Sequence, residues 1–352
     1  MNYLEHPHLA PLRQLMTDPT VSEIMINGPQ RLFVERAGHI EKAPLIFPTP
    51  HHLQICVESL VGFSGRAVNS KSPFVDFRLP DGARVNVVIA PIALDGPVVT
   101  IRRAVKSIRR IDDLVKRGSL TQKMAAFLEA CVAAHANILF SGGAGSGKTT
   151  LLGMLSASIN PEERIIVIED TAELELAQPH VVRMECRPPN MEGAGAISLA
   201  ELLKNSLRMR PTRLILGEVR GEEAFDLLSA FSSGHSGGFA VVHASSPMQA
   251  VSRLELMVLS RGLPYPLWAI QTQICNAIDI IVQQAMMPDG VRRVTEITSV
   301  QGTTEDSVML QDIFNFDHDE RHYVCTGEHP QIMPRLRREM SSIEQILQRG
   351  LA

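Results

Sequence analysis

The sequence predicts an α/β protein with two domains, a smaller α+β domain followed by a larger domain built on a parallel-rich sheet. Two observations predict this architecture. Strand patterns separated by short turns dominate the first hundred residues, whereas helices and short apolar strands alternate after residue 121. Helices that cross over between parallel strands cover both faces of a sheet, so the second domain needs a helical layer on each side.

The first domain is predicted from local hydrophobic patterns and turns. Its clearest element is a hairpin within 74–93, because Pro80-Asp81-Gly82 has turn composition and lies between two alternating runs. In chain order we expect a helix at 9–18, a strand at 23–28, a hairpin across 31–43, a helix at 51–63, the hairpin within 74–93 and a strand at 98–103.

The second domain is predicted from alternating helical and strand periods. Residues 267–316 are expected to add a helix and several strands, and the last 35 residues a polar turn and a short helix. The basic stretch IRRAVKSIRRIDD precedes this domain, so we expect domains at 1–104 and 116–352 joined by a basic linker at 105–115. The alternating elements are helices at 121–136, from 148, at 198–209, 222–232 and 248–261, and strands at 138–140, 165–168, 213–219 and 238–244.

The composition is that of a globular protein and excludes several classes. Hydrophobic residues make up 45% and charged residues 20%, which argues against a disordered chain. With 34 Lys+Arg against 38 Asp+Glu, the net charge of −4 gives no general attraction to nucleic acid or anionic lipid. The five cysteines include no C-x-x-C pair, and no segment reaches the roughly 20 apolar residues that span a bilayer. We therefore expect a soluble cytoplasmic protein with reduced thiols.

A glycine-rich segment at 142–149 matches the phosphate-binding pattern G-x-x-x-x-G-K-[ST]. Glycines let backbone N–H groups point inward around a phosphate, and the N-terminus of the following helix adds positive potential. Lys148 is expected to reach the β- and γ-phosphates, and the Thr149 hydroxyl to bind Mg²⁺. The segment lies between a predicted strand and a predicted helix, which is the context that the pattern requires. The expected nucleotide-binding residues are Gly142, Gly143, Ala144, Gly145, Ser146, Gly147, Lys148, Thr149 and Thr150.

Acidic residues follow two other strands of the predicted sheet. Glu169 and Asp170 follow the strand at 165–168, and Glu218 lies just past the apolar residues 214–216. The carboxyl ends of parallel strands meet at the phosphate loop, so these carboxylates are expected to face the γ-phosphate. One of them can polarise the attacking water while another holds Mg²⁺ or its bound water. The alternative is that each acid caps a helix or lies in a solvated loop.

Two absences and two histidines narrow the class of nucleotide enzyme. Gly217 stands where a Walker B strand usually ends in Asp, so small GTPases and DExx helicases fit poorly. No N-K-x-D guanine-reading motif is present, so ATP is the expected nucleotide. His235 and His243 lie next to predicted strand ends, where a histidine beside a phosphate site can sense or stabilise γ-phosphate charge.

Taken together, these segments resemble a known family, the type II/IV secretion traffic ATPases. The similarity rests on GGAGSGKTT, VIEDTAELEL, SLRMRPTRLILGEVRGEEAFDLL, SSGHSGG, VVHASSP and SRLE. Within the family the chain looks most like the TadA/CpaF branch, which powers assembly of tight-adherence (Flp-type) pili, on VSEIMINGPQRLFVERAGHI, FVDFRLPDGARVNVVI, GPVVTIRRA and DIIVQQAMMPDGVRRVTEITSV. The resemblance covers nearly the whole chain. It implies a RecA-like P-loop ATPase domain with a C-terminal subdomain, preceded by a PAS-like N-terminal domain.

The resemblance also implies roles for individual residues. The family's aspartate box matches 169–173, its atypical Walker B matches 214–218, and its histidine box centres on His243. Glu218 is then the carboxylate that orients water, and Glu169 and Asp170 join Thr149 in supporting Mg²⁺. The family often has TGHDG or TLHAN where this chain has SGHSG and VVHAS, which leaves both histidines in place.

Arginines from another domain or subunit commonly complete the site of a motor ATPase, where they neutralise transition-state charge. The candidates are Arg220, after the Walker B strand, Arg78 and Arg84 in the first domain, and Arg102 and Arg103, at the end of a TIRR strand. Neighbouring strand residues face opposite sides, so we expect only one of the last two to face the nucleotide. The resemblance implies a homo-hexamer that acts on an inner-membrane platform protein, with the chain held peripherally at that membrane.

The sequence therefore favours an ATP- and Mg²⁺-dependent ATPase that powers Tad/Flp-type pilus assembly or protein export. A conjugation or type IV secretion ATPase of the VirB type has the same motifs and remains the alternative. A nucleic-acid translocase is a third possibility, but the acidic balance and the 5% aromatic content count against a single-strand-binding groove. No stable nucleic-acid partner is expected.

Overall fold

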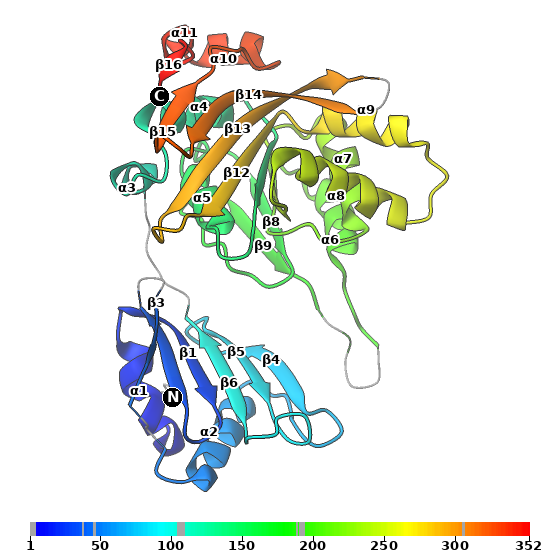
Figure 1. Cartoon of the computed structure of the whole chain (residues 1–352). Coiled ribbons are helices and arrows are strands. Elements are labelled where there is room, and N and C mark those ends of the chain that lie inside the picture. Colours follow the sequence, from blue (N-terminus) through cyan, green and yellow to red (C-terminus); the bar gives the residue numbers. More distant parts are fainter. Residues whose placement is uncertain are drawn as a thin grey trace. The chain divides into compact units, whose positions relative to one another are not determined.

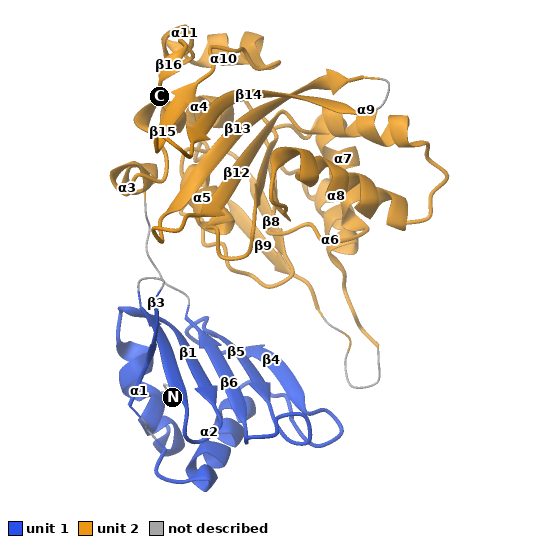
Figure 2. Ribbon diagram, viewed as in Figure 1, with its two compact units in different colours: residues 1–107 blue, residues 108–352 orange. Residues whose placement is uncertain are grey.

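The structure is a computed structural model that describes residues 5–36, 39–44, 47–103, 110–187, 189, 194–304 and 307–352. It divides into two compact units, Met1–Ser107 and Ile108–Ala352, which Figure 2 colours separately. Residues 104–109 of the expected linker lie outside the described residues.

Unit 1 is an antiparallel sheet with helices, as the sequence predicts for this part of the chain. The strand order is β3-β2-β1-β6-β5-β4. Alternate residues of β5 are buried, because one face of the sheet packs against Leu53, Cys56 and Leu60 of α2. The elements are η2 (Pro7–Leu9), α1 (Ala10–Thr17), β1 (Val21–Asn27), β2 (Leu32–Arg36), β3 (His39–Lys42), α2 (Pro50–Gly62), β4 (Phe74–Arg78), β5 (Arg84–Val88) and β6 (Val98–Arg102).

Unit 2 contains a large mixed sheet in the order β16-β15-β14-β13-β12-β7-β11-β10-β8-β9. The strands from β12 to β9 are parallel, and those from β12 to β16 are antiparallel. The strands are β7 (Ile138–Gly142), β8 (Ile165–Glu169), β9 (Val181–Glu185), β10 (Arg213–Leu216), β11 (Phe239–His243), β12 (Ile280–Met286), β13 (Arg292–Thr303), β14 (Val308–Asp317), β15 (His322–Cys325) and β16 (Gly350–Leu351).

Helices cover both faces of this sheet (Figure 1). Successive residues of β8 divide between the two cores, with Ile165 and Val167 in one and Ile166 and Ile168 in the other. The first core includes α4, α5, α10 and α11, and the second includes α6 to α9. The predicted α/β fold is confirmed. The helices are α3 (Ile111–Lys116), α4 (Gln122–Ala133), α5 (Lys148–Ser156), α6 (Leu199–Ser206), η3 (Leu207–Met209), α7 (Glu223–Ser232), α8 (Pro247–Ser260), α9 (Leu267–Ala277), α10 (Met333–Glu339) and α11 (Ile343–Ile346).

Three segments differ from the sequence-based expectation. Residues 111–116, most of which were expected in the linker, form α3 because Ile111 is buried in the first core and Leu114 and Val115 pack against it. Strand β9 was not predicted, since its residues are only partly buried at the sheet edge. The C-terminal residues form β15, α10, α11 and β16 rather than a turn and one helix.

The described part of the chain contains no helix with the length and apolar character needed to cross a bilayer. All five cysteines are free. Burial raises the pKa of the Cys56 thiol to about 12 and that of Cys275 to about 11, so neither thiol is a ready nucleophile at neutral pH.

Candidate functional site

The candidate site of unit 2 lies where the central parallel strands end. In the strand register, Gly142 at the end of β7 pairs with His243 at the end of β11 and with Gln284 of β12. The next strands, β10 and β8, end at Leu216 and Glu169. The sheet therefore brings four segments that are far apart in sequence to one edge, where ligands of open α/β sheets bind.

The segment between β7 and α5 forms the expected phosphate loop. Gly147, the residue before α5, has φ +97°, a left-handed conformation that a residue with a Cβ adopts only with strain. The turn that it makes directs the N-terminus of α5, with its unpaired N–H groups, towards the loop. The local chain is therefore shaped for an anion, as the sequence predicts.

Lys148 occupies the inside of this loop and is only 5% exposed. Its Nζ donates to the carbonyl oxygens of Gly142, at 3.0 Å, and Gly143, at 2.7 Å, and lies 3.4 Å from Nδ1 of His243. Burial lowers the pKa of the Lys148 amine, and the nearby Glu218 carboxylate opposes that shift. A buried ammonium whose hydrogen-bond acceptors are the neutral carbonyls of Gly142 and Gly143 and the His243 ring is well placed to bind an anionic phosphate.

Glu218 lies on the other side of His243 and connects it to Arg220. Its Oε1 is 3.1 Å from Nε2 of His243 and 2.6 Å from Nε of Arg220, and Arg220 Nη2 donates to Oε2 at 2.6 Å. Partial burial raises the pKa of the Glu218 carboxyl, but the hydrogen bond and charge of Arg220 outweigh it, so the pKa lies below its ordinary value. The charges of His243 and Lys148 act in the same direction. Glu218 is therefore ionised at neutral pH.

His243 is held between one basic and one acidic neighbour. Burial lowers the pKa of its imidazole first, the charge of Lys148 lowers it further, and Glu218 opposes both. The net pKa is below 6.5, so the ring is largely neutral at pH 7. A neutral ring can accept from Lys148 at Nδ1 and donate to Glu218 at Nε2, which makes it a hydrogen-bonded link between the two.

Glu169 is almost fully buried, at 2% exposure, beside the end of β10. Its Oε1 accepts from the backbone N–H groups of Glu173, at 2.8 Å, and Leu174, at 3.0 Å, while Oε2 has no hydrogen-bond partner among the described residues. Burial raises the pKa of this carboxyl, and the two backbone hydrogen bonds partly offset the rise. Gly217 makes room for it, since a Cβ there would lie 2.7 Å from Cγ of Glu169. The presence of glycine at 217, in place of the usual Walker B aspartate, thus has a steric explanation.

The donors fit a magnesium ion that a nucleotide brings with it. Mg²⁺ is usually bound by one or two protein oxygens together with phosphate oxygens and waters. Thr149 lies in the first turn of α5, and the partnerless Oε2 of Glu169 is a free acceptor. The Asp170 side chain is more than half exposed, and its Oδ2 lies 3.8 Å from Nη1 of Arg220. No group of three or more His, Cys, Asp or Glu placed to hold a metal by itself occurs within the described ranges.

Comparisons with known proteins agree with this architecture. Residues 5–317 match the family described as type II/IV secretion system protein. The chain belongs to this family. It is 30% identical over 292 residues to a putative conjugal transfer protein of Mycobacterium tuberculosis (81% of this chain, 82% of that protein) and 33% identical over 321 residues to the type IV secretion system protein PtlH of Bordetella pertussis (82% and 93%). The solved Legionella pneumophila ATPase DotB shares the fold, with a TM-score of 0.58, 18% identity and coverage of 88% of this chain and 80% of that one.

Not every expected site residue of this secretion family member lies at the phosphate loop. The stretch around His235 precedes β11, at the opposite edge of the sheet, where the Gly238 carbonyl accepts from the Ile138 N–H at the start of β7. The expectation that His235 lies beside the phosphate site is therefore wrong, because of the two histidines only His243, the last residue of β11, lies at the carboxyl edge. At this far edge the buried Arg213 pairs with Glu163 through both oxygens, at 2.6 and 2.9 Å, and donates to the Gly237 carbonyl at 3.2 Å.

The two arginines at the end of β6 belong to unit 1. Arg103 donates to the backbone carbonyls of Asp18 and Val21, the latter at 2.9 Å, so its guanidinium stabilises unit 1. Arg102 is exposed and lies opposite Glu23 in the strand register. A role for either residue at a nucleotide site stays a prediction.

Three residues of the site were missed by sequence reasoning. Glu223, at the start of α7, accepts from the backbone N–H groups of Arg220 and Gly221 at 2.6 and 2.9 Å, and so fixes the loop that carries Arg220. Gln284 of β12 and Arg292 of β13 contact the phosphate loop from the side, and Nε of Arg292 donates to the Gly145 carbonyl at 2.8 Å. No local pattern could have revealed the contacts of Gln284 and Arg292, because about 140 residues separate the hairpin from the loop, whereas Glu223 lies only three residues after Arg220.

Proposed function

We propose that the chain hydrolyses ATP at the phosphate loop of unit 2 and uses the energy to drive a secretion or pilus-assembly machine. The observation that carries this proposal is the hydrogen-bonded series from Lys148 through His243 to Glu218 at the carboxyl edge of the sheet. A phosphate-binding ammonium and an ionised carboxylate lie on either side of one neutral ring. That arrangement suits a site that binds a phosphate and orients the water that attacks it.

Each residue then has a distinct task. Lys148 exchanges the carbonyls of Gly142 and Gly143 for phosphate oxygens, and Thr149 and Glu169 hold the magnesium ion that ATP brings. Glu218 orients the attacking water, since its low pKa suits it to accept a hydrogen bond rather than to store a proton. Arg220 is bonded to both Glu218 oxygens and is exposed, so it can move towards developing phosphate charge. ATP supplies the phosphoanhydride bond whose hydrolysis releases the energy.

The machine that we favour is a Tad/Flp-type pilus, because the resemblance to the TadA/CpaF branch extends through the N-terminal and C-terminal segments of the chain. Conjugation or type IV secretion of the VirB type is supported by the similar proteins of Mycobacterium tuberculosis and Bordetella pertussis, which are a putative conjugal transfer protein and a type IV secretion system protein. Both readings use the same ATPase chemistry and differ in the partner that receives the motion.

The proposal includes an assembly and a place. The active form is a homo-hexamer in the cytoplasm, bound peripherally at the inner membrane through a platform protein. The division of the chain into two units near residue 107 would let the N-terminal unit move relative to the ATPase unit during each cycle. Stable nucleic-acid binding is not part of the proposal, because the net charge is −4.

Steady-state release of phosphate from ATP, measured across protein concentration, tests the chemistry. We expect activity per subunit to rise with concentration, as for an assembled ring, and to fall by at least about a hundredfold in Lys148→Ala and Glu218→Gln. Glu222→Gln is the matched control, since Glu222 is exposed and lies four residues beyond Glu218. Wild-type activity no higher than that of Glu218→Gln would contradict the ATPase proposal, and strong stimulation by DNA would favour a translocase.

Genetic complementation decides between the two machines. A strain that lacks the gene is complemented with wild type or Lys148→Ala, and both surface pili and conjugation frequency are measured. Loss of pili with unchanged conjugation supports the Tad assignment. Loss of conjugation with normal pili supports the VirB-type assignment.

A further inference from the structure

The phosphate loop has a second wall, formed by the hairpin of β12 and β13. A Cβ on Gly142 would lie 2.4 Å from the Gln284 carbonyl oxygen, so the end of β12 touches the start of the loop. Arg292, at the start of β13, donates from Nε to the Gly145 carbonyl at 2.8 Å. Its Cδ would lie 3.1 Å from a Cβ on Gly147. One arginine therefore contacts the middle and the end of the loop from outside.

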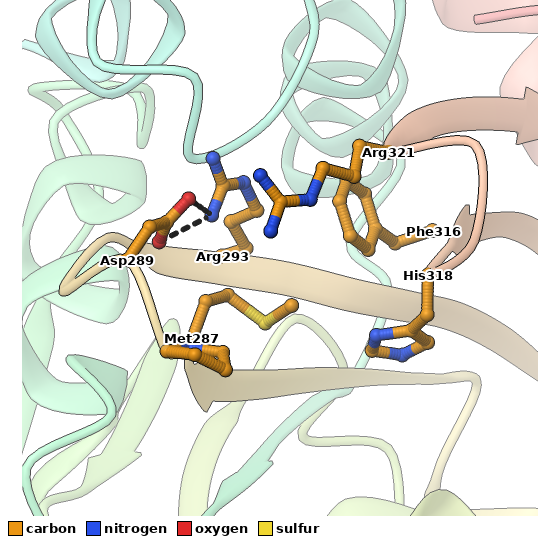
Figure 3. A pocket seen from close by; sticks show the side chains of 7 residues that line it. Met287, Asp289, Arg293, Phe316, His318 and Arg321 are labelled. Atoms are coloured by element: carbon orange, nitrogen blue, oxygen red, sulfur yellow. Dashed lines mark hydrogen bonds and ion pairs between the residues drawn. The ribbon is translucent and has the colours of Figure 1, made fainter.

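Arg292 is distinguished from the arginine that follows it. Arg293 forms a two-oxygen ion pair with Asp289, at 2.8 and 2.7 Å, and its guanidinium lies 5.4 Å from the ring centre of Phe316. Figure 3 shows this pair beside a cavity of about 260 Å³ that Arg321 also lines. Successive strand residues point to opposite faces, so only Arg292 is directed at the phosphate loop.

The contact with Gly145 fixes the direction of a peptide group. In a trans peptide the C=O of one residue and the N–H of the next point in opposite directions. A guanidinium on the outer side of the Gly145 carbonyl therefore turns the Ser146 N–H inward, where it makes only a long 3.4 Å hydrogen bond to the Gly143 carbonyl. Glycine-rich loops lose much conformational entropy when ordered, so an external contact matters more here than in a helix.

We propose that Arg292 is a positioning residue for the phosphate loop, which holds the Gly145–Ser146 peptide ready to bind an anionic phosphate and adds positive charge beside it. This inference rests on the proposed nucleotide site and deepens it. Arg292 acts through the loop and not on the reacting atoms. Its loss weakens binding of ground state and transition state alike, so KM rises while kcat changes little.

The test uses the full chain and a fluorescent ADP analogue, with wild type, Arg292→Ala, Arg292→Lys and Arg293→Ala. We expect Arg292→Ala to weaken ADP binding about tenfold, the size of one charged hydrogen bond. Arg292→Lys retains charge and a donor and should recover part of the loss. Arg293→Ala is the matched control, because it removes a charge and an ion pair from the same hairpin on the other face.

The outcomes separate this inference from the function on which it rests. Failure of the wild type to bind ADP overturns the proposed nucleotide site itself. Normal binding by the wild type with less than a twofold change in Arg292→Ala overturns the role of Arg292 alone. An equal loss of ADP binding in Arg292→Ala and Arg293→Ala, with lowered melting temperatures in both, assigns the effect to the stability of the hairpin. That result also overturns the positioning role of Arg292. If Arg292→Ala fails to fold, the shift in KM of Arg292→Lys at unchanged kcat decides.

Discussion

Gly217 offers a sharp test of the site, because the structure gives its missing side chain a specific steric reason. In the structure a Cβ at 217 lies 2.7 Å from Cγ and 3.2 Å from Oε1 of Glu169, both in a buried side chain. Even Gly217→Ala therefore overpacks the site, which typically costs about 1–3 kcal/mol. For a unit of this size that corresponds to a fall in melting temperature of about 2–12 °C.

Differential scanning calorimetry of a double-mutant cycle measures this effect. Glu169→Ala removes the atom that clashes, so Gly217→Ala should cost about 1 kcal/mol less in that background than in the wild type. Gly143→Ala serves as a stability control, because a Cβ there meets nothing within 4 Å. The steric explanation is refuted if Gly217→Ala melts within about 1 °C of wild type, since 1 kcal/mol corresponds to a few degrees. It is also refuted if the stability changes of the two single variants simply add in the double variant.

Three further predictions concern the two edges of the sheet. Arg213→Met should destabilise unit 2 by about 3–5 kcal/mol in urea unfolding, because it leaves the mostly buried Glu163 carboxylate without its guanidinium partner, and a cost below about 1 kcal/mol would contradict this. Gly238→Ala should also lower the stability of unit 2 by about 1–3 kcal/mol, since its Cβ would lie 2.2 Å from a ring carbon of Phe231 in α7. An unchanged urea midpoint would contradict this prediction. By NMR titration His243 should protonate below pH 6.5, and further below it in Glu218→Gln, because the carboxylate raises its pKa. Between the pKa of His243 in the folded protein and 6.5, its value in the unfolded chain, the unfolded chain binds more protons than the folded protein. His243 therefore lowers the stability of the fold as the pH falls through 6.5. A pKa above 6.5 for His243 would contradict the geometry.

Sequence reasoning was strongest where a local pattern has one structural solution. The spacing of Gly142, Gly147 and Lys148 predicts a strand, a loop and a helix N-terminus, and β7 and α5 have those positions. Alternating helices and apolar strands likewise predicted the parallel sheet and its two helical layers. The helix at 111–116 was missed because the five basic residues of IRRAVKSIRRIDD resemble a linker, whereas burial of Ile111, with Leu114 and Val115 packed against the same core, decided its structure.

Sequence alone determined the phosphate loop, the acidic residues at the strand ends and the secretion family, because these depend on short segments whose chemistry is local. Tertiary structure decided which distant residues meet them. It placed His243 between Lys148 and Glu218, placed His235 at the far edge, and brought Arg292 onto the loop. Those outcomes depend on strand order and on the end of the strand at which each residue lies. The spacing of residues along the chain does not encode the strand order.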